Sequence, residues 1–180
     1  MELDWKVDSS WTLFLDRDGV INERLFGEYI LQESDFNFKE GVLQVSSNLF
    51  SKFMRVILVT NQQCIGKGLI SGQGVDQIHQ FMLSEFKRYN AEIDLILIAP
   101  EVKGDQSTMR KPLPKMAHLA KQKFTQIDFS KCVMVGDTDT DIEFGKNLGM
   151  KTVLITSEED CISVPDLKIS SLVELNLLLE

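Results

Sequence analysis

The stretch Leu13-Phe14-Leu15-Asp16-Arg17-Asp18-Gly19-Val20 joins a short apolar run to two carboxylates separated by one residue. The apolar run predicts a buried strand that carries Asp16 at its carboxyl end and Asp18 on the loop beyond, where Gly19 permits a sharp turn. Two carboxylates this close repel each other, and a hard cation such as Mg²⁺ relieves the repulsion. The same tetrapeptide is also compatible with ordinary turn chemistry, because Asp and Gly are frequent in turns.

Composition indicates one domain over residues 1–180, with 43% hydrophobic and 26% charged residues. No apolar run approaches the roughly 20 residues that a membrane-spanning helix needs, and the amino terminus has no signal-peptide pattern. We therefore expect a cytoplasmic protein with no membrane partner, either a monomer or a small homo-oligomer.

The formal net charge of −8 disfavours nucleic-acid binding, which depends on neutralisation of phosphates by Lys and Arg. A locally basic segment between Lys103 and Lys123 is compatible with a small anionic partner, such as a phosphorylated metabolite. Three scattered cysteines indicate reduced thiols, and the two histidines have no partner at metal-ligand spacing, so no zinc site is expected.

Short apolar runs alternate with amphipathic segments along the chain. The predicted strands are Trp11–Leu15, Arg55–Thr60, Ile93–Ala99, Cys132–Gly136 and Thr152–Thr156. The predicted helices are Gly41–Phe53, Val75–Tyr89, Leu113–Phe124, Asp139–Leu148 and Leu172–Leu179. This alternation predicts a Rossmann-like α/β/α sandwich of three layers around a mainly parallel sheet of five or six strands. Two long connections, residues 19–39 and 100–112, are interpreted as a flap and a specificity loop.

Ligands of open parallel sheets bind beyond the carboxyl ends of the strands, and polar residues follow four of these ends. They are Asp16 and Asp18, then Thr60, Asn61 and Gln62, then Arg110 and Lys111, and finally Asp137. Phosphoryl transfer could use Asp16 as nucleophile and Asp18 as general acid and base. Lys111 and Thr60 would compensate charge, and Asp16, Asp18 and Asp137 would hold Mg²⁺.

Each of these groups also has a structural interpretation. Thr60 and Asn61 could cap the next helix, and Arg110 and Lys111 could form a surface pair. Asp139 is interpreted as a first-turn acid at a helix N-terminus, whereas Asp141 is left open between that role and the metal site. Residues 65–68, Ile-Gly-Lys-Gly, lack the spacing of a Walker P-loop.

The four motifs, in this order, resemble those of the haloacid dehalogenase superfamily of phosphatases, over about Trp11 to Ile155. The resemblance implies an aspartyl phosphate on Asp16, proton transfer by Asp18, roles for Thr60 and Lys111 as the second- and third-motif residues, and metal binding by Asp16, Asp137 and the Asp18 carbonyl. The motif Asp-Arg-Asp-Gly-Val-Ile-Asn is similar to that of the small capless branch, which holds heptose 1,7-bisphosphate phosphatases and histidinol-phosphatase domains. The predicted substrate-binding residues are Arg17, Asn61, Gln62 and Arg110.

One departure from that branch concerns zinc. Its members usually carry a zinc loop of Cys and His before the Arg-Lys-Pro motif, whereas residues 100–109 here contain neither residue, so zinc is predicted to be absent. We therefore predict a Mg²⁺-dependent phosphomonoesterase acting on a small sugar phosphate, with a heptose bisphosphate as the first choice. The alternatives are a histidinol phosphatase and a catalytically idle domain that binds a phosphorylated ligand.

Overall fold

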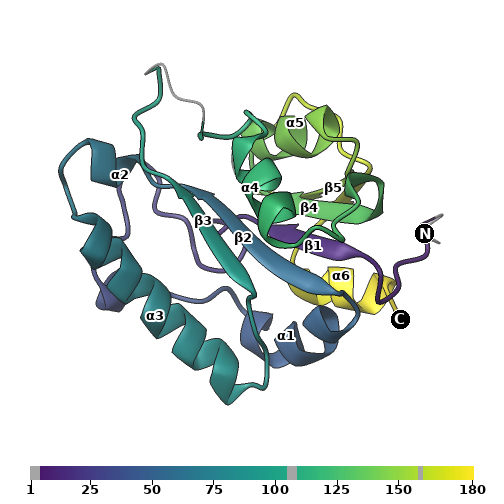
Figure 1. The fold of residues 1–180 in the computed structure, drawn as a ribbon. Helices are drawn as coiled ribbons and strands as arrows, with labels where there is room; N and C mark the ends of the chain where they lie inside the picture. The colour runs from purple at the N-terminus through teal and green to yellow at the C-terminus, as the bar shows by residue number, and fades with distance from the viewer. Residues whose placement is uncertain (1–4, 105–108, 158–159) are drawn as a thin grey trace.

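The sheet is parallel throughout and has six strands in the order β3-β2-β1-β4-β5-β6 (Figure 1). A computed structural model describes residues 5–104, 109–157 and 160–180 of the chain. The strands are β1 (Thr12–Leu15), β2 (Arg55–Asn61), β3 (Leu95–Ala99), β4 (Cys132–Gly136), β5 (Lys151–Ile155) and β6 (Leu167–Ile169). In doubly wound folds, ligands bind in the crevice where the strand order reverses. In this sheet that crevice lies beside β1.

All five predicted strands are confirmed, with ends that differ from the predicted ones by at most two residues. The sixth strand, β6, is three residues long and pairs with β5 through Val153, Leu154 and Ile155. A three-residue segment at the edge of a sheet is too short for a periodic pattern, which explains why no separate strand was predicted there.

The five predicted helices are also confirmed. The structure has α1 (Val42–Ser51), α2 (Gln63–Gly66), α3 (Gly72–Arg88), α4 (Lys115–Lys123), α5 (Asp139–Asn147) and α6 (Leu172–Leu178), with short 3₁₀ turns at Glu33–Asp35 and Phe129–Lys131. Ser71 caps α3 by accepting a hydrogen bond from the amide of Gly74. None of the helices in the described part of the chain combines the length and the apolar character needed to cross a bilayer.

Helices cover both faces of the sheet, as expected for three layers (Figure 1). Helices α1, α3 and α6 lie on one face, and α4 and α5 lie on the other. Alternate side chains of β1 point to opposite cores: Leu13 and Leu15 pack on the α1 side, and Phe14 packs on the α4 side, edge-on to Phe144. The fully buried β1 therefore anchors the chain where the two cores meet.

The strand register brings the polar strand ends together. Leu15 of β1 pairs with Leu58 of β2 on one side and with Val135 of β4 on the other. The amide of Asp16 donates to the carbonyl of Val135 at 3.0 Å, so Asp16 begins the loop beside the end of β4. The carboxyl ends of β1, β2 and β4 consequently form one edge.

The predicted flap is fixed at its base and open at its tip. Val20 and Ile21 are fully buried, and Ile30 and Phe36 also belong to the core. Phe26, between these anchors, is 55% exposed. The segment has no regular strand or α-helix, apart from isolated bridges and one 3₁₀ turn. Its tip is therefore positioned by the buried residues on either side.

Candidate active site

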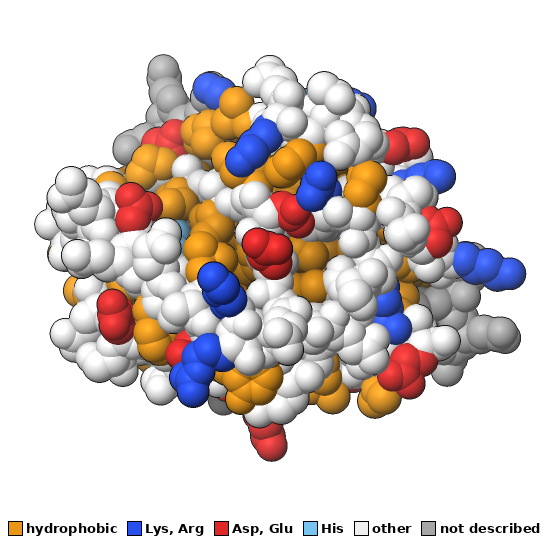
Figure 2. All heavy atoms as spheres, turned by 60° about the horizontal axis from the view of Figure 1, so that its bottom comes forward, with side chains coloured by type: hydrophobic (Ala, Val, Ile, Leu, Met, Phe, Trp, Pro, Cys, Tyr) orange, Lys and Arg blue, Asp and Glu red, His pale blue; other side chains and the backbone are white. Residues whose placement is uncertain are grey.

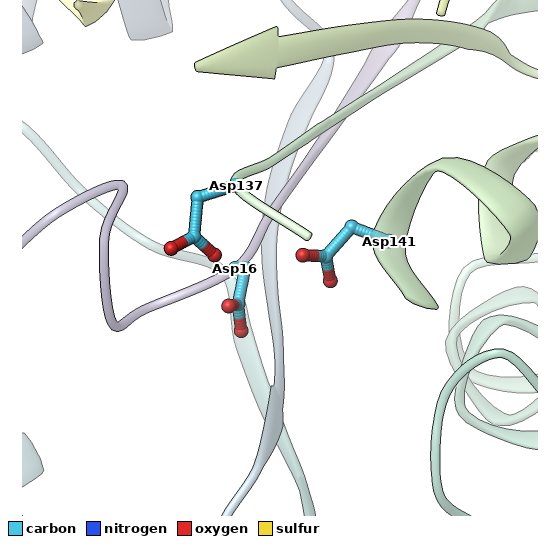
Figure 3. Close-up of side chains that lie close together, drawn as sticks. All are labelled: Asp16, Asp137 and Asp141. Atoms are coloured by element: carbon cyan, nitrogen blue, oxygen red, sulfur yellow. The ribbon is translucent and has the colours of Figure 1, made fainter. Parts of the chain in front are cut away.

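Three carboxylates converge at the carboxyl edge of the sheet. Asp16 follows β1, Asp137 follows β4 and Asp141 lies in the first turn of α5, and Figure 3 shows the three side chains pointing toward one another. One oxygen of each lies within 4.8 Å of the others. The prediction that brought Asp16 and Asp137 to one edge is confirmed, and Asp141 belongs both to this cluster and to the first turn of α5.

The close approach of Asp141 depends on Gly136, the last residue of β4. A side chain at Gly136 would place its Cβ 2.0 Å from the Cβ of Asp141, so only glycine leaves the required space. Asp141 also serves the helix, because its Oδ2 accepts hydrogen bonds from the amide and the hydroxyl of Thr138 at 3.1 and 2.7 Å. Its other oxygen, Oδ1, faces the cluster.

Lys111 supplies the buried positive charge of this cluster. Its Nζ lies 2.7 Å from Asp16 Oδ1, 2.6 Å from Asp141 Oδ1 and 2.7 Å from the carbonyl of Val59. Asn61 fixes the backbone of Lys111: its side-chain oxygen accepts from the Lys111 amide at 2.9 Å, and its nitrogen donates to the Lys111 carbonyl at 3.3 Å. The surface-pair interpretation of Lys111 is wrong, because the residue is only 2% exposed.

The crowding of buried carboxylates changes their acidity. Burial raises the pKa of Asp16 to about 7; Lys111 opposes this, and the carboxylates of Asp141 and Asp137 reinforce it. Burial likewise raises the pKa of Asp137 to about 6, with a contribution from Asp141. Burial alone would lower the pKa of Lys111, but Asp141 and Asp16 outweigh it and raise that pKa. The cluster carries more negative charge than Lys111 alone compensates.

The donor set fits a divalent cation. Asp137 Oδ1 is buried and has no hydrogen-bond partner among the described residues, while its Oδ2 accepts from Arg24 at 3.1 Å. Gly19, at φ +85°, lets the neighbouring loop approach, since a Cβ there would lie 2.0 Å from Asp137 Oδ2. Carboxylate oxygens are the ligands that Mg²⁺ prefers. Asp16, Asp137 and Asp141 could therefore hold such an ion. Asp18, which was predicted as a ligand with Asp16 and Asp137, does not belong to this group of carboxylates, and its part in metal binding stays a prediction.

The carboxylate of Asp18 accepts hydrogen bonds from three side chains. Arg17 donates to both carboxylate oxygens through Nη2, at 2.9 and 3.0 Å, Asn22 donates to Oδ1 at 2.9 Å, and Gln62 donates to Oδ2 at 2.8 Å. Burial alone would raise the pKa of Asp18, but the charge of Arg17 and these hydrogen bonds hold it below its usual value. The carboxylate of Asp18 thus has a fixed orientation.

Three other residues named in the sequence analysis, Thr60, Arg17 and Asp139, contact protein groups in the structure. Thr60 is buried, and its hydroxyl accepts from Gln62 at 2.9 Å, so it supports Gln62 in this structure. Arg17 is also buried and engages Asp18, so a direct contact of Arg17 with substrate stays a prediction. Asp139 lies in the first turn of α5 and accepts from the Ser163 amide at 2.6 Å, which confirms its interpretation as a helix N-terminal acid.

A pocket of about 460 Å³ opens above the carboxylates. Its lining includes the tip of the flap, residues 24–30, together with Gln62, Lys67 and Arg110. Lys67 donates to the hydroxyl of Tyr29 at 2.7 Å and so joins α2's loop to the flap. The interpretation of residues 19–39 as a flap over the site is supported by this lining.

Arg24 and His79 were not among the predicted site residues. Arg24 lies six residues beyond Asp18 in the flap, where no local pattern distinguishes it from a surface arginine, and His79 lies on α3, far away in the sequence. Only the fold of the flap brings Arg24 to Asp137, and only the packing of α3 brings His79 to Arg17.

The described start of the predicted specificity loop lies against α2. The Gly66 amide donates to the carbonyl of Pro100 at 3.0 Å, and the Lys103 amide donates to the side chain of Gln63 at 3.2 Å. These contacts fix the described start of the loop, residues 100–104, against α2; residues 105–108 lie outside the described part. The absence of zinc stays a prediction.

Buried His79 predicts loss of stability in acid. Burial and the charge of Arg17 lower its pKa from 6.5 to about 3. Between these values the unfolded chain binds a proton that the folded protein does not, so stability falls as pH falls, by up to about 1.4 kcal/mol per pH unit for one group. Urea denaturation at pH 6, 5 and 4 gives the free energy of unfolding at each pH. This free energy should fall less steeply with decreasing pH in His79→Gln than in the wild type, and an equally steep fall in both would contradict the prediction.

Comparisons with known proteins agree with this geometry. A family model described as HAD-hydrolase-like matches residues 108–167. The D-glycero-α-D-manno-heptose-1,7-bisphosphate 7-phosphatase of Campylobacter jejuni is 31% identical over 82% of this chain and 83% of its own length. Among solved structures, the D,D-heptose 1,7-bisphosphate phosphatase of B. bronchiseptica, complexed with magnesium and phosphate, superposes with a TM-score of 0.81 at 22% identity, covering 94% of this chain and 97% of that one.

The chain therefore belongs to the haloacid dehalogenase superfamily of phosphatases, in the group that contains these heptose bisphosphate phosphatases. A bifunctional histidine-biosynthesis protein, HisB of Buchnera aphidicola, is 32% identical over 78% of this chain, which covers 39% of that protein's length. The superfamily that the four motifs resemble and the fold predicted from the alternation of strands and helices are both confirmed.

Proposed function

We propose that the chain is a Mg²⁺-dependent phosphomonoesterase that removes the 7-phosphate of a heptose 1,7-bisphosphate. The observation that carries the proposal is the buried cluster of Asp16, Lys111, Asp137 and Asp141 on the floor of the pocket. The similarity to phosphatases of heptose bisphosphates over most of the chain supports the substrate class.

The reaction would proceed by two displacements. A carboxylate oxygen of Asp16 attacks phosphorus, the bond to the sugar oxygen breaks, and the protonated form of Asp18, a minor form in the unliganded site because its pKa is lowered, gives the leaving oxygen a proton. Water then attacks the aspartyl phosphate and gives a proton to Asp18, which releases phosphate and restores Asp16. Lys111 keeps Asp16 oriented and compensates charge throughout. Mg²⁺ held by Asp16, Asp137 and Asp141 would supply further charge compensation to the phosphoryl oxygens.

The wall of the pocket suits a second phosphate group. Arg24, Lys67 and Arg110 all contribute to the lining, and Arg24 also contacts Asp137 of the carboxylate floor at 3.1 Å. A substrate with one phosphate at Asp16 could place its second phosphate among these cations. We infer that the flap, which contributes residues 24–30 to the lining, shapes this wall.

The charge pattern on one face of the molecule favours a small substrate over a nucleic acid. On the face that carries α1, α3 and α6, basic side chains stand singly and are interspersed with acidic ones (Figure 2). Nucleic-acid binding uses contiguous basic surface to neutralise successive phosphates. The net charge of −8 agrees with this assignment.

The proposal predicts selective phosphate release. With Mg²⁺ present, a panel of heptose 1,7-bisphosphate, histidinol phosphate, hexose monophosphates, an aryl phosphate and a short 3′-phosphorylated oligonucleotide should give the highest kcat/KM for the heptose bisphosphate. A higher value for histidinol phosphate would favour that alternative. Hydrolysis of no member, the aryl phosphate included, would favour an idle binding domain and overturn the proposal.

Histidinol phosphate is disfavoured by the charge of the lining. Its amine requires acidic partners, for which the flap offers Glu23, Glu28 and Glu33. Of these, only Glu28 lines the pocket in the described part of the chain, and it shares the wall with Arg24, Lys67 and Arg110. A cationic substrate would therefore meet more repulsion than an anionic one.

The metal assignment predicts a thermal shift without any turnover. Mg²⁺ should raise the melting temperature of the wild-type protein, because an ion bound only by the folded state stabilises it, by about 2.7 kcal/mol at a hundredfold excess over Kd. Asp137→Asn removes one carboxylate and should abolish most of the shift. The matched variant Asp76→Asn, at an exposed position of α3, should retain it. An undiminished shift in Asp137→Asn would contradict the assignment.

A further inference from the structure

The orientation of Asp18 is set by a buried arginine. Arg17 is 1% exposed, and its guanidinium contacts Asp18 through three hydrogen bonds: Nε and Nη2 donate to Oδ1 at 3.2 and 2.9 Å, and Nη2 donates to Oδ2 at 3.0 Å. Such a fork fixes the plane of the carboxylate as well as its position. The direction of Asp18 therefore depends on where the guanidinium of Arg17 is held.

The remaining nitrogen of Arg17 reaches α3. Its Nη1 lies 3.2 Å from Nε2 of His79, which is 3% exposed. A guanidinium has only donors, so Nε2 of His79 must accept, which places the imidazole proton on Nδ1 and leaves the ring neutral. Phe36 covers one face of the guanidinium, with its ring centre 5.9 Å from Cζ. His79 and Phe36 thus restrain Arg17 on the side away from Asp18.

From these contacts we infer that His79 is a positioning residue, which fixes Arg17 and, through it, the carboxylate of Asp18 for proton transfer to the leaving oxygen. The inference rests on the proposed function, because it assigns His79 to the geometry of that reaction. Without an acceptor at position 79, the Nη1 group loses its buried partner and the guanidinium can pivot about Asp18. Displacements of about 1 Å in a reacting group can cost 10²-fold in rate.

Gln62 and Asn22 hold Asp18 from other directions, and their role differs from that of His79. Each donates one hydrogen bond to a single oxygen of Asp18, at 2.8 and 2.9 Å. Arg17 contacts both oxygens of Asp18 and carries the positive charge. The restraint that His79 places on Arg17 therefore affects the plane of the Asp18 carboxylate more than the single hydrogen bond of Gln62 or Asn22 does. The link also connects the catalytic loop to α3, a helix none of whose residues, all of them described, lines this pocket.

Dependence on the leaving group distinguishes positioning of Asp18 from a general structural role. Departure of an alkoxide needs a proton from Asp18, whereas p-nitrophenolate leaves without one. We expect His79→Leu to lower kcat/KM about tenfold or more for heptose 1,7-bisphosphate and for glycerol phosphate, and less than about threefold for p-nitrophenyl phosphate. His79→Gln, which retains an acceptor, should keep alkyl phosphate hydrolysis within about threefold of the wild type.

Met82→Ala is the matched control, because Met82 is fully buried on α3 in the same core and lies one turn beyond His79. It should lower the melting temperature and change both substrate types equally. Equal losses on alkyl and aryl phosphates in His79→Leu, or no advantage of Gln over Leu, would overturn the inference. A wild type that hydrolyses glycerol and aryl phosphates but not the heptose bisphosphate would overturn the substrate assignment alone. A wild type inert toward all three would overturn the proposed function and the inference with it.

Discussion

Replacing Asp16 by Asn is expected to lower kcat by on the order of 10⁴-fold or more, because the amide cannot act as the attacking oxygen anion. Uncatalysed hydrolysis of phosphate monoesters is extremely slow, so loss of the nucleophile leaves no efficient alternative route. Phosphate release with Mg²⁺, followed for the substrate panel above, measures the effect.

The Asp16→Asn protein should remain folded. The substitution nearly preserves shape, removes one of several carboxylates that repel each other, and leaves Lys111 paired with Asp141 at 2.6 Å. Circular dichroism and the melting curve should therefore stay close to those of the wild type. Asp76→Asn is the control for the chemical change alone and should keep full activity. Substantial turnover by Asp16→Asn would show that another group is the nucleophile.

Replacing Lys111 by Met is expected to damage both stability and activity. The substitution leaves Asp16 and Asp141 buried without their ammonium partner, and breaking a buried ion pair from one side typically costs about 3–5 kcal/mol. It also removes charge compensation at the nucleophile, which is expected to lower kcat by about 10²–10³-fold or more. Urea denaturation in the presence of EDTA and steady-state kinetics measure the two effects.

Mg²⁺ separates the two consequences of the Lys111→Met substitution. An ion bound by Asp16, Asp137 and Asp141 can replace part of the lost positive charge, so saturating Mg²⁺ should restore part of the stability but little of the activity. Lys87→Met, at an exposed site of α3, should leave both unchanged. A Lys111→Met protein as stable as the wild type in EDTA would show that Lys111 is not the counterion of the cluster.

The sequence was sufficient to predict where the principal acids meet. Continuous apolar runs that end in polar residues predict buried parallel strands, and parallel strands deliver their carboxyl ends to one edge. This reasoning placed Asp16 and Asp137 together, and the register of β1 with β4 bears it out. The strand ends carried this information because each of these two residues directly follows a strand whose apolar pattern is strong. Lys111 comes late in the long loop after β3, and its contact with Asp16 at 2.7 Å confirms that it joins them.

Asp141 could not be assigned from sequence alone, because an acid in the first turn of α5 satisfies the helix and the cluster equally well. The structure shows that it does both, with Oδ2 toward Thr138 and Oδ1 toward Lys111. The deciding feature is the space beside Gly136, which no local pattern reveals. Arg24 and His79 escaped prediction for a related reason, since each reaches the site only through tertiary packing of the flap and of α3.

Asp16 is the residue that accepts the phosphoryl group in the proposed mechanism. The direct measurement is acid quenching of the enzyme during turnover of heptose 1,7-bisphosphate with Mg²⁺, followed by peptide mass spectrometry. We expect one phosphoryl group on the peptide that carries Asp16 in the wild type and none in Asp16→Asn. A phosphoryl group on another residue, or steady turnover with no modified peptide at any quench time, would contradict this mechanism.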